Sequence, residues 1–336
     1  MEGRKGAGVA VRGPAGGTVL EISARDVLAA HRRIAGRIWP TPLMPADIGG
    51  GRPVHLKLEC WQRTGSFKVR GAMNAMSLLD GEGRRRGVIA VSAGNHAQGV
   101  ALAAAEAGTS ALIVMPENAS RVKVEAVRAL GAEVRLVGRD YDEAELALPT
   151  VQAETGRALV HPFADPAVVA GQGTVGLEIA LERPTVRQVV IPVGGGGLAV
   201  GSAIALKALL PGVRVYGVQT EASAPVVASY RAGRHVRVAY GPSLADGLWG
   251  DTTDEMVEMC LAHLDGVLEV TEAAVARAMR QLFREQRVVA EGSGAAALAA
   301  LREGLLPSDV ETAAVITGRN VAPELFERVL GGEDGP

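Results

Sequence analysis

The sequence is poor in aromatic residues and in cysteine, and both shortages narrow its class. Aromatic side chains make up 3% of the 336 residues, so the cores must be built mainly from alanine, valine and leucine. The two cysteines, Cys60 and Cys260, have neither the spacing of a metal site nor the number of a disulfide framework. The sequence therefore predicts a protein of the reducing cytoplasm and no metal site.

Long apolar runs and a strong net charge are also missing. No uninterrupted apolar stretch is long enough to cross a bilayer, which argues against a membrane protein. A formal net charge of −2 gives no electrostatic case for nucleic acid or a membrane surface as a partner. The start of the chain holds basic residues and glycines without an apolar signal core, so residues 1–20 are predicted to be a flexible tail.

The chain is rich in glycine and in small apolar residues, which follow an alternating pattern. Apolar strands, such as 87–91 and 188–193, alternate with helical segments along most of the chain. Continuous apolar strands between helices are typical of parallel sheets covered on both faces. The predicted fold class is therefore α/β, with two doubly wound domains and mostly parallel sheets.

The length allows two cores, and the order of elements suggests how they share the chain. We predict that a small domain of residues 80–159 is inserted into a large domain made of residues 21–79 and 160–330.

Four consecutive glycines, at 194–197, give the strongest local signal. They follow the strand predicted at 188–193 and open a helix predicted at 198–210. The backbone N–H groups at a helix start attract anions, and glycine lets the backbone approach a phosphate closely. A turn needed only for packing would rarely use four glycines, so the pattern favours phosphate binding.

A dinucleotide site is one alternative for this turn. Gly194, Gly196 and Ala199 fit a G-x-G-x-x-A pattern, and the next strand ends near the acidic Glu221. That interpretation gives a nicotinamide-dependent oxidoreductase, but it leaves Lys68 without a role.

Lys68 lies among small residues in the segment 64–72, between an extended stretch at 53–59 and a helix predicted from about 71 to 79. A lysine held at such a junction can lose water, give up its proton more readily and act as a nucleophile. An ordinary solvated lysine is the alternative, and only the other motifs favour the functional interpretation.

A second set of polar residues follows the strand 87–91. The hydroxyl of Ser92, the amide of Asn95 and the N–H groups of the helix that follows could hold a carboxylate or a cofactor oxygen. Ser92 or Asn95 could equally cap that helix, and His96 could be a neutral, packed residue. Glu291 and Thr317 belong to segments that, taken singly, look like a cap and a turn.

Together these segments resemble the serine/threonine dehydratase branch of the pyridoxal-phosphate enzymes of fold type II, the tryptophan-synthase β-subunit fold. Residues 64–72 resemble the cofactor-lysine motif of that branch, and residues 92–101 resemble its substrate loop. Residues 170–174 and the glycines at 194–197 also match. The resemblance covers roughly residues 27–330, and several long motifs in a fixed order make it specific.

The resemblance implies a role for each site residue. Lys68 would form the imine with pyridoxal 5′-phosphate, with Phe67 packed near the ring. Asn95 would bond the 3′-oxygen of the cofactor, Glu291 would lie beside its ring, and Thr317 would face the pyridine nitrogen. The phosphate would be held by Gly194, Gly195, Gly196 and Gly197. Ser92, Asn95 and His96 would surround the substrate carboxylate.

The implied reaction is α,β-elimination from a β-hydroxy amino acid such as L-threonine or L-serine. The freed Lys68 amine removes the α-proton while the cofactor ring accepts electrons, and the product hydrolyses to a 2-oxo acid and ammonia. A hydroxyl partner such as Thr317 leaves the ring a weaker electron sink than a carboxylate would. This favours prompt loss of the β-hydroxyl over racemisation.

Departures from the family pattern matter as well. Racemases of the branch place a second serine where Ala93 stands, so Ala93 argues for elimination. Some relatives begin a divalent-metal site at a residue matching Glu221, but Val227 stands near a later expected carboxylate, and no metal is predicted. Arg319 replaces a usual glycine, and Trp249 could restrict the pocket.

The sequence therefore predicts a cytoplasmic lyase that uses pyridoxal 5′-phosphate and forms a dimer or tetramer. The alternatives within the fold are a serine- or aspartate-type racemase and a β-replacement enzyme. Outside it, they are the nicotinamide-dependent oxidoreductase and a binding protein that has kept the fold.

Overall fold

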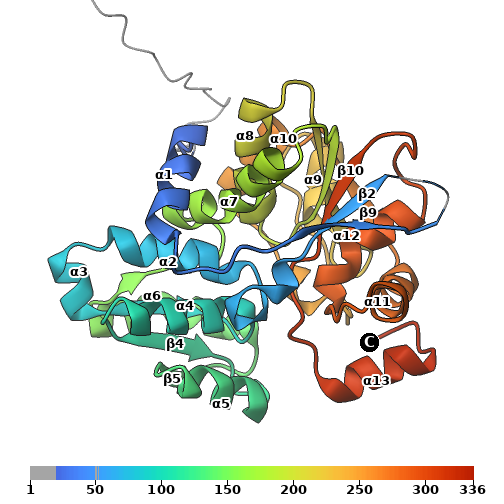
Figure 1. Ribbon diagram of the computed structural model, residues 1–336. Coiled ribbons are helices and arrows are strands. Elements are labelled where there is room, and N and C mark those ends of the chain that lie inside the picture. The colour runs from blue at the N-terminus through green and yellow to red at the C-terminus, as the bar shows by residue number, and fades with distance from the viewer. Residues whose placement is uncertain (1–19, 50, 52) are drawn as a thin grey trace, which may run out of the picture.

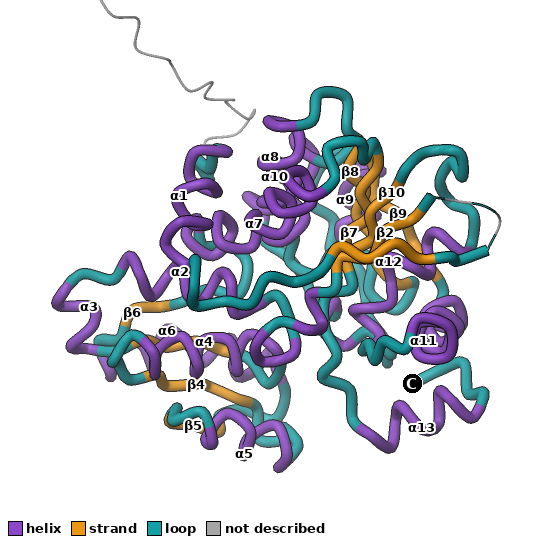
Figure 2. The backbone as a smooth tube through the Cα atoms, viewed as in Figure 1, coloured by secondary structure: helices purple, strands orange, loops and turns teal. Residues whose placement is uncertain are grey.

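Two separate β-sheets organise the protein (Figures 1 and 2). The computed structural model describes residues 20–49, 51 and 53–336. The tail predicted over residues 1–20 lies outside the described residues, except for Leu20. Within the described part of the chain, no helix combines the length and the apolar composition needed to cross a membrane.

The larger sheet has six strands, all parallel except β1, which pairs with β2 in antiparallel fashion. Its central strands consist mainly of apolar residues and are buried on both faces. In spatial order its strands are β1 (Leu43–Ala46), β2 (Val54–Lys57), β10 (Thr312–Val315), β7 (Gln188–Pro192), β8 (Arg214–Thr220) and β9 (Gly266–Val270).

Helices cover both faces of the six-stranded sheet. Alternate residues of its strands pack into two different cores, one with α12 and one with α8. On the first face α12 (Gly292–Arg302) is backed by α11 (Glu272–Gln286), and α11 contacts α13 (Pro323–Gly331). On the other face lies α8 (Gly197–Leu209). The helices grouped with it are α1 (Ala24–Ile34), α7 (Pro166–Glu182), α9 (Pro225–Ala232) and α10 (Asp254–His263).

The smaller sheet has four strands, all parallel, and it lies beside α2 (Lys68–Leu78) and α3 (Gly81–Arg86) in Figure 1. One face packs against α4 (Asn95–Glu106) and α5 (Arg121–Ala129), and the other against α6 (Tyr141–Thr155). Its spatial order is β5 (Glu133–Leu136), β4 (Ala111–Met115), β3 (Val88–Val91) and β6 (Ala158–Leu159).

The α/β fold class predicted from the sequence is confirmed, with mostly parallel strands in both sheets. The strands of the larger sheet come from residues 43–57 and 188–315, and those of the smaller sheet from residues 88–159. The domain boundaries at 79/80 and 159/160 stay a prediction.

One predicted helix differs in a way that matters for the site. The helix predicted from about residue 71 begins at Lys68, so the lysine is the first residue of α2 rather than part of the loop before it.

Candidate active site

Lys68 lies half-buried at the start of α2, where its amine meets a backbone carbonyl. Its Nζ donates to the carbonyl oxygen of Pro162 at 3.0 Å. Burial disfavours the charged form and lowers the pKa of the Lys68 amine to about 8. A substantial fraction of the amine is therefore neutral near physiological pH, and a neutral amine is a nucleophile and a base.

The glycine turn at 194–197 joins β7 to α8 and has little room for side chains. A Cβ added to Gly195 would lie 2.1 Å from the ring carbon Cγ of Phe163. Gly196 has φ +95°, a backbone conformation that other residues rarely adopt. Gly196 is also the N-cap of α8, and no described side chain caps that helix. The turn therefore presents backbone N–H groups to an anion at the positive end of a 13-residue helix.

The segment 161–163 connects Lys68 to the glycine turn. Pro162 accepts the hydrogen bond of the lysine, and the next residue, Phe163, packs its ring over Gly195. His161 packs edge-on against Phe163, and its Nδ1 accepts the backbone N–H of Ala164 at 2.8 Å. Burial and the nearby Lys68 lower the pKa of His161 to about 4, so the ring is neutral. The sequence analysis missed this segment, although a phenylalanine in a chain with four of them was a usable signal.

Asn95 joins the smaller sheet to the larger one through a pair of hydrogen bonds. Its Nδ2 donates to Glu291 Oε1 at 2.7 Å, and its Oδ1 accepts from Asn320 Nδ2 at 2.6 Å. Asn320 also donates to the carbonyl oxygen of Thr64, which has the strained φ of 62°. Asn320 belongs to the same segment as Thr317 but had no role from the sequence, and these contacts make it a further candidate site residue.

Glu291 is almost fully buried where these loops meet. Burial, reinforced by the charge of Asp246, raises the pKa of its carboxyl to about 7. A Cβ on Gly318 would lie only 2.2 Å from Glu291 Oε1, so this position needs glycine. Glu291 and Asn95, named separately from the sequence, thus lie in direct contact.

Phe67 and Thr317 also lie together, beside Lys68. The backbone N–H of Phe67 donates to the carbonyl oxygen of Thr317 at 3.1 Å, and Thr317 is buried just after β10 ends. The Lys68 Nζ lies 5.3 Å from the centre of the Phe67 ring. The backbone therefore places the two residues next to the lysine, as a shared cofactor site requires.

The side chains of Ser92 and His96 are occupied locally. Ser92 Oγ accepts the backbone N–H of Gly94 at 3.1 Å. His96 is buried, and its Nε2 lies 2.9 Å from the carbonyl oxygen of Val160. Burial, with a smaller effect from Lys68, lowers the pKa of His96 to about 3. The His96 ring is therefore neutral and packed, so the segment offers a carboxylate mainly a hydroxyl and the N–H groups at the start of α4.

Three further residues were discussed with the family pattern, and their side chains have other surroundings. Arg319 is exposed, and its backbone N–H donates to Gly65. Trp249 is 46% exposed, and its Nε1 donates to Gly241. Glu221 accepts the backbone N–H of Glu272 at the start of α11, so its carboxylate serves a helix end and not a ribose.

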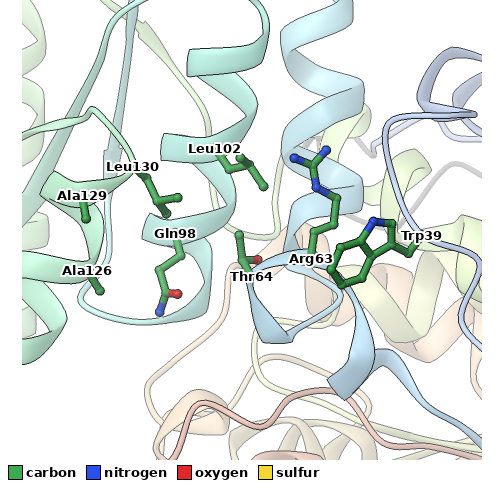
Figure 3. A pocket seen from close by; sticks show the side chains of 8 residues that line it. All are labelled: Trp39, Arg63, Thr64, Gln98, Leu102, Ala126, Ala129 and Leu130. Atoms are coloured by element: carbon green, nitrogen blue, oxygen red, sulfur yellow. The ribbon is translucent and has the colours of Figure 1, made fainter.

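A pocket of about 310 Å³ lies next to this cluster, between α4, α5 and the loop before Lys68 (Figure 3). None of the predicted site residues lines it. Its walls are mostly apolar, and Thr64 lies between Gln98 and Arg63 (Figure 3). The lining residues are Trp39, Arg63, Thr64, Gln98, Leu102, Ala126, Ala129 and Leu130.

The cluster fits pyridoxal phosphate on its chemistry. Lys68 offers an amine of lowered pKa to the aldehyde, and the glycine turn offers an uncapped helix start to the phosphate. Among the described residues, no group of three or more histidine, cysteine, aspartate or glutamate side chains is placed to hold a metal ion.

Comparison with known proteins gives the class. Residues 34–318 match the model of the family described as pyridoxal-phosphate dependent enzyme. The chain belongs to this family, and its cofactor is pyridoxal 5′-phosphate.

Individual relatives and solved structures narrow the resemblance. The chain is 44% identical over 317 residues to an L-threonine ammonia-lyase of Thermotoga maritima, and the match covers 92% of this chain and 78% of that protein. Among solved structures, a threonine deaminase from T.th. matches with a TM-score of 0.83 at 40% identity, over 89% of this chain and 99% of that one. Maize serine racemase matches with a TM-score of 0.87 at 32% identity, over 92% and 97%. The resemblance seen in the motifs is confirmed.

Proposed function

We propose that this enzyme is a lyase that eliminates water from L-threonine, and also from L-serine, to release a 2-oxo acid and ammonia. The observation that carries the proposal is the half-buried Lys68 amine, whose pKa is about 8. This amine donates to the carbonyl oxygen of Pro162, and the next residue, Phe163, packs over the glycine turn. The relatives named as threonine ammonia-lyase and threonine deaminase support it.

Each site residue has a task in this reaction. When bound, the cofactor supplies a ring that accepts the electrons of the breaking Cα–H bond. Lys68 Nζ takes the α-proton, and the Pro162 carbonyl fixes the direction of that amine. Ser92 and the N–H groups at the start of α4 hold the substrate carboxylate. Asn95 and Glu291 would hold one edge of the ring, and Thr317 would face its nitrogen.

Ala93 favours elimination over racemisation. A racemase needs a second group to return a proton to the opposite face of the α-carbon, and the methyl group of Ala93 cannot do so. The serine racemase of maize is similar in fold at 32% identity, which keeps racemisation as the competing activity to measure.

The test is a direct assay of the purified protein with pyridoxal phosphate. We expect a 2-oxo acid and ammonia in equal amounts from L-threonine, without any second nucleophile. Lys68→Ala should lower kcat by about 10³-fold or more and remove the visible absorbance of the bound cofactor. Lys207, which pairs with Asp265 at 2.9 Å near the C-terminal end of α8, provides the control Lys207→Ala, which should stay active.

Two results would contradict the proposal. The first is full activity of Lys68→Ala. The second is formation of D-allothreonine from L-threonine, or of D-serine from L-serine, measured by chiral chromatography, faster than formation of the 2-oxo acid.

We also propose that the enzyme works in the cytoplasm as a homodimer or homotetramer. The free thiols of Cys60 and Cys260, both buried, suit a reducing compartment. Trp39 and Trp61 are 56% and 40% exposed and flank Gln62, which binds the backbone of Trp39, so they offer apolar area to another subunit. Light scattering after gel filtration measures the subunit number, and a monomer at all concentrations would contradict this proposal.

A further inference from the structure

The first turn of α2 carries the reactive lysine, yet the N-cap residue of this helix makes no capping hydrogen bond with its side chain. Phe67 is the N-cap, and no described side chain caps the helix there. The helix therefore needs other contacts to fix its start, since unpaired N–H groups at helix ends are a source of fraying. Those contacts come from Arg70, two residues after Lys68 in the same turn.

Arg70 is fully buried and every arm of its guanidinium group has a partner. Its Nε and Nη2 donate to the two carboxylate oxygens of Glu59, at 2.7 and 2.8 Å. Its Nη1 and Nη2 donate to the two oxygens of Glu178, at 2.6 and 2.8 Å. Two bidentate pairs on one planar group fix its position and its orientation.

A third partner, Thr174, ties the same group to α7. Arg70 Nη1 donates to Thr174 Oγ1 at 3.0 Å. One residue after Arg70, the N–H of Gly71 donates to the side-chain oxygen of Gln172 at 3.1 Å. The two helices touch at glycines, because a Cβ on Gly171 would lie 2.6 Å from the Gly71 Cα. The segment 170–174, singled out in the sequence without a role, thus meets the first turn of α2.

A second cation makes the buried cluster electrically balanced. Lys57, also fully buried, contacts Glu178 at 2.8 Å and donates to the carbonyl oxygen of Thr41 at 2.6 Å. Its third partner is Glu182, whose side chain is 43% exposed. Two cations and two carboxylates, with Glu182 at the edge, therefore share one buried site. A buried charge is tolerated only when it is paired in this way.

We propose that Arg70, held by Glu59, Glu178 and Thr174, is a positioning residue that fixes the first turn of α2 and thereby sets where the Lys68 amine lies. This inference rests on the proposed function, in which that amine carries the proton. The carbonyl of Pro162 receives the amine on the other side, so a shift of the turn moves the donor away from its acceptor.

Two variants of graded severity test this role. Thr174→Val keeps the shape and all the charges but removes one hydrogen-bond acceptor from Arg70, together with the bond that the hydroxyl donates to the Gly171 carbonyl in its own helix. Arg70→Lys keeps the charge and loses the planar, bidentate geometry. Because a misplacement of about 1 Å can cost about 10²-fold in rate, we expect kcat to fall about 10²-fold in Arg70→Lys and about tenfold in Thr174→Val. The KM for L-threonine should stay within about twofold.

The matched control is Glu182→Gln. Glu182 contacts Lys57 at the edge of the same cluster and makes no contact with Arg70. This variant should unfold at a slightly lower temperature and keep its kcat.

A second readout does not depend on turnover. Competitive labelling of amines in the cofactor-free protein, analysed by mass spectrometry across pH, measures the pKa of Lys68. In the wild type we expect about 8. In Thr174→Val and Arg70→Lys it should rise toward the value of a solvated lysine, because a loosened turn lets water reach the amine.

The outcomes separate the inference from the proposed function. If the wild type does not act on L-threonine, the proposed function fails, and the labelling still decides whether Arg70 controls the amine. If Thr174→Val matches Glu182→Gln in kcat and in Lys68 pKa, the cluster only stabilises the fold and the inference is wrong. Thr174→Val decides alone if Arg70→Lys does not fold.

Discussion

Burial shifts the pKa of two site groups, the amine of Lys68 and the carboxyl of Glu291, toward pH 7. The pKa of the amine falls to about 8 and that of the carboxyl rises to about 7. In both groups the neutral form gains, because each loses water without gaining a close partner of opposite charge. A group that takes up or gives up a proton works best when its pKa lies near the working pH.

We expect Glu291→Gln to stabilise the protein at alkaline pH. The unfolded carboxyl has its ordinary pKa of 4.5, whereas the folded one keeps its proton up to about pH 7. The unfolded chain therefore binds fewer protons in this window, and the free energy of unfolding falls as the pH rises from about 4.5 to 7. Glutamine avoids this cost and can still accept from Asn95. Its gain at pH 8 should be about 1–3 kcal/mol larger than at pH 4.5.

Urea unfolding of the cofactor-free protein at the two pH values measures this difference. The exposed Glu285 provides the control Glu285→Gln, whose effect should be the same at both. An equal effect of Glu291→Gln at pH 4.5 and pH 8 would show that the carboxyl keeps its ordinary pKa.

At the scale of the element, the glycine turn depends on a contact that only the folded chain provides. Replacing Gly195 by alanine puts a methyl group into the Phe163 ring, which must move away. Phe163 follows Pro162, so the shift reaches the carbonyl that holds Lys68. We expect Gly195→Ala to weaken pyridoxal-phosphate binding about tenfold to 100-fold, the equivalent of the 1–3 kcal/mol that overpacking typically costs.

Fluorescence titration of the cofactor-free protein with pyridoxal phosphate measures the loss. Gly331→Ala is the matched control, since a Cβ there meets no atom within 4 Å and the residue lies in α13. Unchanged affinity in Gly195→Ala would mean that the phosphate does not use this turn.

The sequence predicted the elements with strong local signals and missed those without them. Ser23 begins α1 through a capping box with Asp26, and such a pair can be read directly from the sequence. The start of α2 at Lys68 could not be read from the sequence, because Phe67 offers no capping side chain. The turn is fixed instead by contacts with distant residues, such as the hydrogen bond from Gly71 to Gln172. The helix α10 was missed although Thr253 caps it, and the short strands β1 and β9 were missed for a different reason. β1 and β9 are partly exposed and show no continuous apolar run.

The same limit applies to the site. Lys68, the glycine turn and Asn95 belong to motifs, so their residue types and neighbours identified them. Asn320 and Phe163 act through partners that are distant in the chain. Asn320 donates to Asn95. Phe163 packs on the glycine turn, whose position depends on the larger sheet. Only the packing of two sheets reveals such contacts.

At the scale of the whole molecule, two polar contacts supplement the Asn95 link between the sheets. The loop between α9 and α10 reaches the smaller sheet's helices, where Tyr240 Oη donates to Asp142 Oδ2 at 2.5 Å and Asp246 pairs with Lys123 at 3.1 Å. The hydrogen bond to Asp142 is the largest cause that raises the pKa of Tyr240, to about 12, so the hydroxyl stays a donor. The same loop binds the glycine turn through Thr252, whose Oγ1 donates to the carbonyl oxygen of Gly195 at 3.1 Å. A movement of the smaller sheet can therefore reach the glycine turn.

Removing one of these contacts should loosen the connection without unfolding either sheet. In Tyr240→Phe we expect faster hydrogen–deuterium exchange at residues 141–150 and at 241–252. The unfolding free energy should change by only about 1 kcal/mol, the typical worth of one hydrogen bond. Tyr230→Phe is the control, because its hydroxyl donates to Leu264 at 3.2 Å within the larger unit. If both variants change exchange at 141–150 equally, Tyr240 does not tether the smaller sheet. If only Tyr240→Phe does, the loop between α9 and α10 tethers α6 to the larger sheet.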